Sequence, residues 1–142
     1  MNKVVILLML TAAVALSSCG GTTVAPPCAA VAIEVHPTVG TADHMAAAPG
    51  DSVQFNAVEL YTLNGTSLSC PIPAAQLGVT DAATWTVSDA VNVRISNAAG
   101  TQGMATCVAA TNGPVTVTAT APDNLDTKPS VILTGTATLT CN

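Results

Sequence analysis

The sequence predicts an all-β protein, a two-sheet sandwich of about seven strands. Apolar and polar residues alternate with a period of two in several short segments, and residues typical of turns separate those segments. The chain is rich in threonine and valine and only 8% charged, which suits strands better than helices. Because it has one Phe, one Tyr and one Trp, its core must consist mainly of small aliphatic side chains, which cross-links would help to stabilise.

The N-terminus has the parts of a secretory signal peptide. Lys3 supplies the positive start, the segment from Val4 to Leu16 is almost entirely apolar, and small residues follow it. The apolar run is shorter than the roughly 20 residues that span a bilayer. We therefore expect residues 1–18 to form a helical signal peptide that is cleaved, rather than a permanent membrane helix.

The segment Leu16-Ser17-Ser18-Cys19 resembles the lipobox of bacterial lipoproteins. The resemblance implies that Cys19 carries a lipid, that the leader is removed before it, and that the protein is exported and anchored to the cell envelope. In that family an Asp after the cysteine tends to retain the protein at the inner membrane. Here the position is Gly20, which implies the outer membrane. Residues 19–28 are expected to be a flexible tether, and residues 29–142 one domain.

Alternation predicts the first strand at Val31 to His36, followed by an irregular connection from Pro37 to Gly50. The second strand is expected at Asp51 to Leu63. It should carry a bulge near Ala57, because the apolar residues change to the other face after that position. Asn64-Gly65 then predicts a tight hairpin turn, since both residues tolerate positive φ.

The segment from Thr66 to Thr80 lacks periodicity and is expected to be the longest irregular surface. A central strand is expected at Ala83 to Ser88. The other four strands are expected at Val91–Ile95, Met104–Ala109, Val115–Thr120 and Leu133–Thr140. The expected core side chains are Phe55, Trp85, Val87, Val117 and Leu139.

Four segments in this order resemble bacterial immunoglobulin-like domains of the BIG2 group. They are the valine-rich strand that ends at Pro37, Pro49-Gly50-Asp51-Ser52-Val53-Gln54-Phe55, Thr84-Trp85-Thr86-Val87-Ser88-Asp89, and Gly113-Pro114-Val115-Thr116-Val117-Thr118-Ala119-Thr120. The likeness covers about residues 29 to 141. It implies an immunoglobulin-like sandwich that serves as a binding, spacer or adhesion module and performs no catalysis.

If Cys19 is lipidated, four of the five cysteines remain, an even number that favours two disulfides in an exported chain. Four free buried thiols are the alternative. Zinc is disfavoured because no two cysteines are close in sequence and neither histidine lies near one at ligand spacing. With alternating strand directions in such a sandwich, Cys28 should lie near Cys70 at one end, and Cys107 near Cys141 at the other.

No motif predicts catalysis. The two histidines, His36 and His44, belong to no nucleophile motif, and the chain has no phosphate loop, no HExxH and no dinucleotide fingerprint. The histidines also lack a second ligand at a spacing that would form a metal site. Asp123, Asn124 and Asp126 offer oxygens to calcium, but a turn explains them better. We therefore expect no enzyme, no cofactor and no metal.

Three basic residues stand against eight acidic ones, which argues against nucleic acid as a partner and against binding to an anionic membrane surface. Apart from the membrane that holds its lipid anchor, the expected partner is a protein, with no small-molecule substrate. The expected function is a cell-envelope lipoprotein that presents an immunoglobulin-like domain for protein contact or adhesion. The alternatives are a periplasm-facing structural or spacer lipoprotein and, less favoured, an envelope enzyme. The expected contact loop and its flank carry Tyr61, Leu68, Pro71 and Pro73.

Overall fold

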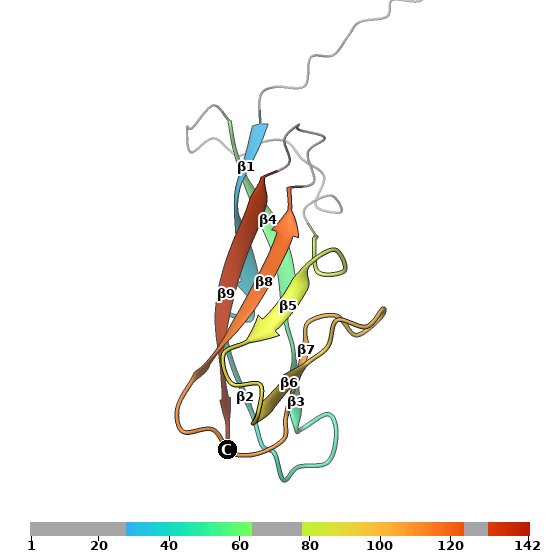
Figure 1. Ribbon diagram of the computed structural model, residues 1–142, viewed down its shortest axis with the longest axis vertical. Coiled ribbons are helices and arrows are strands. Elements are labelled where there is room, and N and C mark those ends of the chain that lie inside the picture. The colour runs from blue at the N-terminus through green and yellow to red at the C-terminus, as the bar shows by residue number, and fades with distance from the viewer. Residues whose placement is uncertain (1–27, 64–77, 124–130) are drawn as a thin grey trace, which may run out of the picture.

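The computed structural model describes residues 28–63, 78–123 and 131–142. Within these segments the chain forms nine strands in three sheets and no helix, in a sandwich-like arrangement (Figure 1). The all-β prediction is therefore confirmed. No helix of the described residues has the length and apolar character needed to cross a membrane. The expected signal peptide and Cys19 lie outside the described residues.

One layer of the fold is a four-stranded sheet in the order β2-β9-β8-β5. Its strands are β2 (Val39–Ala42), β5 (Thr84–Val87), β8 (Val115–Pro122) and β9 (Ile132–Cys141). β2 runs parallel to β9, and the other neighbours are antiparallel. In β8 and β9, buried aliphatic side chains alternate with outward threonines, as the sequence predicts.

The other layer consists of two small sheets, β1-β4 and β3-β7-β6. Their strands are β1 (Cys28–His36), β3 (Ser52–Gln54), β4 (Asn56–Leu63), β6 (Val93–Ile95) and β7 (Met104–Cys107). Only Phe55 separates β3 from β4, and its N–H donates to the carbonyl of Gly103 at 2.9 Å. One continuous segment therefore links the two small sheets: in Figure 1, β1 and β4 lie behind β8 and β9, and β3, β6 and β7 lie below β5.

The two layers share one core. Phe55, Trp85, Val117 and Leu139 are all at most 1% exposed, and Val87 is half-buried and packs against them. The indole N–H of Trp85 donates to the carbonyl of Thr80 at 3.1 Å, so this large side chain is buried without leaving its polar atom unpaired.

Two glycines permit close approaches within the core. A Cβ at Gly135 would lie 2.4 Å from the carbonyl oxygen of Ile33, so β1 packs directly against β9 at this point. Gly103 has φ of 78°, and a Cβ there would lie 2.4 Å from the carbonyl oxygen of Phe55. Larger residues at either position would push strands of the fold apart.

The structure has nine strand segments where about seven were expected, for two reasons. The connection from Pro37 to Gly50, expected to be irregular, contains β2, which pairs with residues far along the chain in β9. The expected second strand, Asp51 to Leu63, is divided at Phe55 into β3 and β4, which belong to different sheets. The expected central strand is also misplaced, because β5 lies at the edge of its sheet.

The prediction of a bulge near Ala57 is wrong. Ala57 and Glu59 follow Phe55 in unbroken alternation and are buried, whereas Leu60 is 42% exposed on the opposite face. The register irregularity of this sheet lies in the partner strand β1, between Ala30 and Ala32. The sequence misled because the inward position after Ala57 is a carboxylic acid, which imitates the end of the apolar face.

The predicted strand from Val91 to Ile95 starts later, at Val93. The carboxylate of Asp89 accepts hydrogen bonds from the backbone N–H groups of Val91 at 3.2 Å and Asn92 at 3.1 Å. This local hydrogen bonding favours a turn over a strand. It leaves Val91 83% exposed rather than facing the core.

Candidate functional site

Several of the residues singled out in the sequence lie outside the described part of the chain. They are Cys19, Cys70, Leu68, Pro71, Pro73, Asn124 and Asp126. Cys28, expected to end the tether, is the first residue of β1, but its predicted bond to Cys70 is also outside the description. The other cysteines, the histidines and Tyr61 have defined positions.

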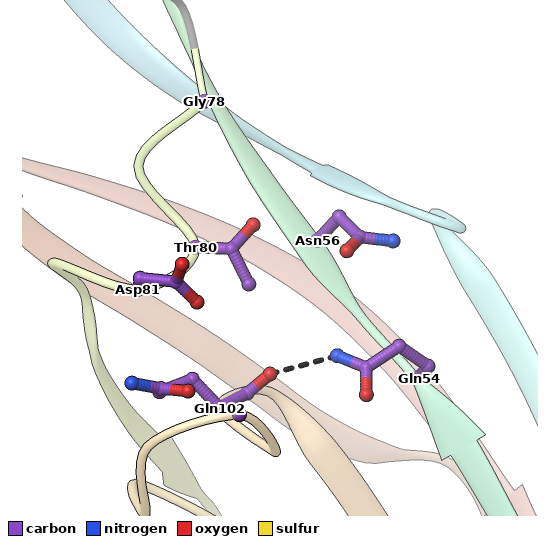
Figure 2. A pocket seen from close by; sticks show the side chains of 7 residues that line it. Gln54, Asn56, Gly78, Thr80, Asp81 and Gln102 are labelled. Carbon is purple, nitrogen blue, oxygen red and sulfur yellow. Dashed lines mark hydrogen bonds between the residues drawn. The ribbon is translucent and has the colours of Figure 1, made fainter.

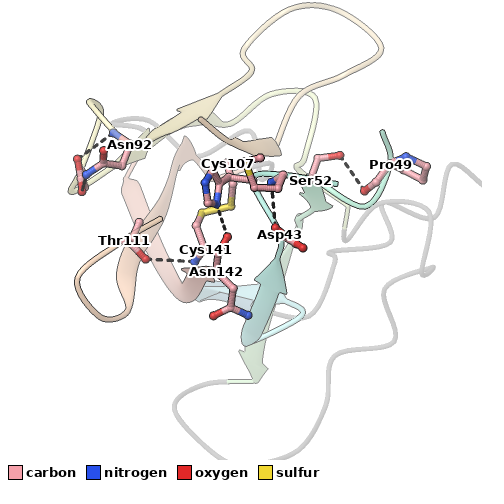
Figure 3. The surroundings of a disulfide bond; sticks show 11 residues. Asp43, Pro49, Ser52, Asn92, Cys107, Thr111, Cys141 and Asn142 are labelled. Atoms are coloured by element: carbon pink, nitrogen blue, oxygen red, sulfur yellow. Dashed lines mark hydrogen bonds between the residues drawn. A yellow bond between two sulfur atoms is a disulfide. The ribbon is translucent and has the colours of Figure 1, made fainter. Parts of the chain in front are cut away.

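Cys107 and Cys141 form a disulfide with a Cα–Cα distance of 5.7 Å, the pairing expected from the strand directions (Figure 3). Both side chains are buried. The backbone N–H of Cys141 also donates to the Thr111 hydroxyl at 3.1 Å, and the N–H of Cys107 donates to the carbonyl of Asp51 at 2.8 Å. The bond joins the end of β7 in one layer to the end of β9 in the other, so it holds the two layers together at this end.

The histidines occupy separate structural settings. His36 is exposed, with Nε2 3.5 Å from the carboxylate of Glu34. The Nδ1 of His44 instead contacts the backbone oxygen of Asn142. Among the described residues, no three His, Cys, Asp or Glu side chains gather in a way that would hold a metal ion. Asp123 follows β8, and its N–H donates to the carbonyl of Val131 at 2.8 Å.

Tyr61 is not a freely presented aromatic. It is half-buried, and its hydroxyl donates to the carboxylate of Glu59, which is 1% exposed. Partial burial, and then the hydrogen bond and negative charge of Glu59, raise the pKa of Tyr61 well above its usual range, with a further contribution from the charge of Asp123. The hydroxyl of Tyr61 thus helps to satisfy a carboxyl group inside the fold.

A polar pocket of about 410 Å³ opens on the side of the molecule (Figure 2). Three parts of the chain form it: the β3–β4 segment, the segment that leads into β5, and the turn between β6 and β7. The lining residues are Gln54, Asn56, Gly78, Thr80, Asp81, Gly100 and Gln102. None of them is aromatic, apolar in character or basic, so hydrogen bonding and negative charge dominate its chemistry.

Hydrogen bonds to the backbone hold two walls of the pocket in place. The side-chain N–H groups of Gln54 donate to the carbonyls of Phe55 at 2.8 Å and Gln102 at 2.7 Å. The hydroxyl of Thr80 accepts a hydrogen bond from the N–H of Ala57 at 2.8 Å and donates to the carbonyl of Ala57 at 3.3 Å. The β6–β7 turn and the segment before β5 are therefore both tied to the β3–β4 segment.

Three side chains present polar atoms that these bonds leave unused. The Oε1 atom of Gln102 is buried and has no hydrogen-bond partner within the described structure. The side chains of Asn56 and Asp81 are exposed at the pocket, and no hydrogen bond to either is found in the described part of the chain. Gln102 thus brings one buried, unpaired acceptor to the pocket wall, whereas the exposed side chains of Asn56 and Asp81 are the ones that a ligand in the pocket could reach.

The sequence contained only a weak signal for this pocket. Gln54 and Asn56 are two residues apart in the expected second strand, so they share an outward face. The contributions of Asp81 and Gln102 depend on tertiary packing that a sequence pattern does not show. A comparison with known protein families finds no match, and a search of curated proteins finds no similar sequence.

Proposed function

We propose that this protein is a cell-envelope lipoprotein that presents a non-catalytic immunoglobulin-like domain for contact with another protein. Two parts of the proposal rest on the sequence, namely lipidation at Cys19 and export by the leader. The structure contributes the strand order, which supports the immunoglobulin-like assignment, and the positions of surfaces that a partner could reach.

The strand order is the observation that carries the proposal. In a constant-type immunoglobulin sandwich, strands A, B, E and D face strands C, F and G. If β1 and β2 are taken as one strand that changes sheets, and β3 and β4 as another, the order here is the same. One layer then reads β1, β3/β4, β7, β6, and the other reads β5, β8, β9 with β2 added at its edge. By this count, the nine segments correspond to seven strands.

The strand pairing also orients the domain relative to the expected anchor. Cys28 pairs with Leu63 at one end of the fold, and the Cys107–Cys141 disulfide lies at the other. A flexible tether of residues 19–27 would span roughly 15–18 Å on average. The Cys28 end would therefore face the bilayer. Leu63, the last described residue before the expected contact loop, would then be on the membrane side of the domain.

The end away from the expected anchor exposes apolar side chains suited to protein contact. Met45 is 80% exposed, Val91 is 83% exposed and Val108 is 46% exposed. Val108 lies beside the turn that carries Val91, because its N–H donates to the carbonyl of Asn92 at 2.8 Å. A partner that stands off the membrane would meet this end and the pocket on the side before it met the Leu63 end.

Metabolic labelling with a palmitate analogue tests the anchor. The wild-type protein should incorporate the label, and the Cys19→Ala variant should not. Equal labelling of both would contradict the lipoprotein assignment. Digestion of intact cells with a broad protease, with a periplasmic protein as leakage control, then tests the location. Loss of the domain places it on the cell surface, whereas protection until the outer membrane is broken favours the periplasmic spacer.

Site-specific photo-cross-linking in intact cells tests protein contact. A photoreactive residue at Val91 should give a discrete adduct with a partner. The same residue at Thr136, which is exposed on the outer face of the four-stranded sheet, serves as control. Adducts at Val91 alone support a contact at the far end. The absence of adducts at Val91, at Met45 and at the pocket would contradict the proposed function.

A further inference from the structure

We infer that the polar pocket receives a cationic side chain, arginine or lysine, from a protein partner. The inference deepens the proposed function and rests on it, since it assumes that the partner is a protein. Its chemical basis is independent of the membrane anchor and comes from the atoms that line the pocket.

The free groups of the pocket are mainly hydrogen-bond acceptors. Gln54 uses its N–H groups on two backbone carbonyls, which leaves its Oε1 as the unused atom. Asp81 adds a carboxylate on the side of the pocket opposite Gln54 and Asn56 (Figure 2), and the Oε1 of Gln102 lacks a donor. A guanidinium or ammonium group supplies several N–H donors and no acceptor, so it complements this set.

The charge of the site points the same way. Asp81 contributes a negative charge, no lysine, arginine or histidine lines the pocket, and the whole chain has a formal net charge of −5. A cation would form charge-assisted hydrogen bonds with Asp81, which are stronger than bonds between neutral groups. An anion would be repelled by the Asp81 carboxylate. A sugar would lack the aromatic stacking surface that such sites generally offer, because no aromatic residue lines this pocket.

Trp85 provides a built-in reporter for occupancy. It is the only tryptophan of the chain, and its indole N–H donates to the carbonyl of Thr80, a residue of the pocket wall. The chain therefore gives a single indole signal in a ¹H–¹⁵N spectrum. A group that binds between Thr80, Asp81 and Gln102 should shift this signal without touching the buried ring.

The experiment is a titration of the mature, lipid-bearing protein in detergent micelles. The probes are N-acetyl-arginine amide, N-acetyl-lysine amide and N-acetyl-citrulline amide, a neutral molecule with nearly the shape of the arginine probe. We expect arginine to shift the indole signal saturably at millimolar concentration, and citrulline to bind about tenfold more weakly because it lacks the charge. The lysine probe shows whether a planar guanidinium is required.

Asp81→Asn should weaken arginine binding about tenfold and bring it close to that of citrulline. Asp51→Asn, which changes the charge equally at the disulfide end, should bind arginine like the wild type. No shift with either cation, equal binding of citrulline, or equal effects of both substitutions would overturn the inference. Failure of palmitate labelling or of cross-linking would leave this result intact, so the two proposals fail separately.

Discussion

Gly103 should be far less tolerant of alanine than Gly100, although both have the same unusual backbone conformation. Their φ angles are 78° and 81°, so an L residue is disfavoured at both positions by about 1 kcal/mol. The surroundings differ. A Cβ at Gly100 would meet nothing within 4 Å, whereas at Gly103 it would lie 2.4 Å from the carbonyl oxygen of Phe55 and 2.9 Å from the Trp85 ring.

The clash at Gly103 involves backbone and a buried ring, so it cannot be relieved by moving the end of a flexible side chain. Overpacking of this kind typically costs about 1–3 kcal/mol. We therefore expect Gly103→Ala to lose about 2 kcal/mol more of the free energy of unfolding than Gly100→Ala. For a domain of this size, that difference corresponds to roughly 5–15 °C in melting temperature.

Urea unfolding followed by Trp85 fluorescence measures both variants, with Gly100→Ala as the matched control for the backbone term. The two m values should agree, so that the difference in midpoint reports stability alone. Equal midpoints for the two variants would refute the reasoning, because the close approach of a Cβ at position 103 to Phe55 and Trp85 is the only difference invoked.

Three further predictions concern cross-links, strand edges and titration. Replacing Cys107 and Cys141 by alanine should lower the free energy of unfolding by about 4 kcal/mol, the chain-entropy value for a separation of 34 residues, as measured by urea unfolding. The Asn97 side chain covers the edge of β5, since it accepts from the N–H of Trp85 at 2.7 Å and donates to the carbonyl of Trp85 at 3.0 Å. Asn97→Ala should therefore lower the free energy of unfolding by about 1–2 kcal/mol. It should also promote self-association through the opened β5 edge, which light scattering would detect. Because the pKa of Tyr61 is raised in the folded state, the unfolded chain loses this proton first, and stability should fall as the pH rises above about 10. Tyr61→Phe should flatten that fall in alkaline melting curves, and an unchanged slope would contradict it.

The sequence predicted well wherever alternation was local and regular. The threonine and aliphatic positions of β8 and β9 could be read directly, and turn residues marked the ends of most strands. The Cys107–Cys141 pairing followed from strand directions, because two strand ends meet at one end of a sandwich. These features depend on residues that are close in the sequence, or on the alternation of strand direction in a sandwich.

The features that the sequence did not predict are of two kinds: pairing between segments far apart in the chain, and polar groups buried inside the fold. β2 has no clear alternation of its own and forms only because β9 offers a parallel partner. Glu59 interrupts the apolar pattern of its strand, yet it is buried beside Tyr61. A pattern of apolar and polar residues places such a carboxyl group outside, so its burial could not be predicted without the tertiary partner.

The pocket itself follows from the division of one layer at Phe55. Before this residue, the strand edge pairs with β7, and the N–H of Phe55 makes the last bond, to Gly103. Beyond it, the same edge bonds to the segment before β5, because the N–H of Ala57 donates to the Thr80 hydroxyl and its carbonyl accepts from the N–H of Val79. Around Asn56 this edge leaves the β6–β7 turn and has not yet reached the segment before β5. The space between these two segments is the pocket. The change of sheet that sequence alternation missed is thus also what creates the pocket, so an error in the predicted strand concealed the candidate functional site.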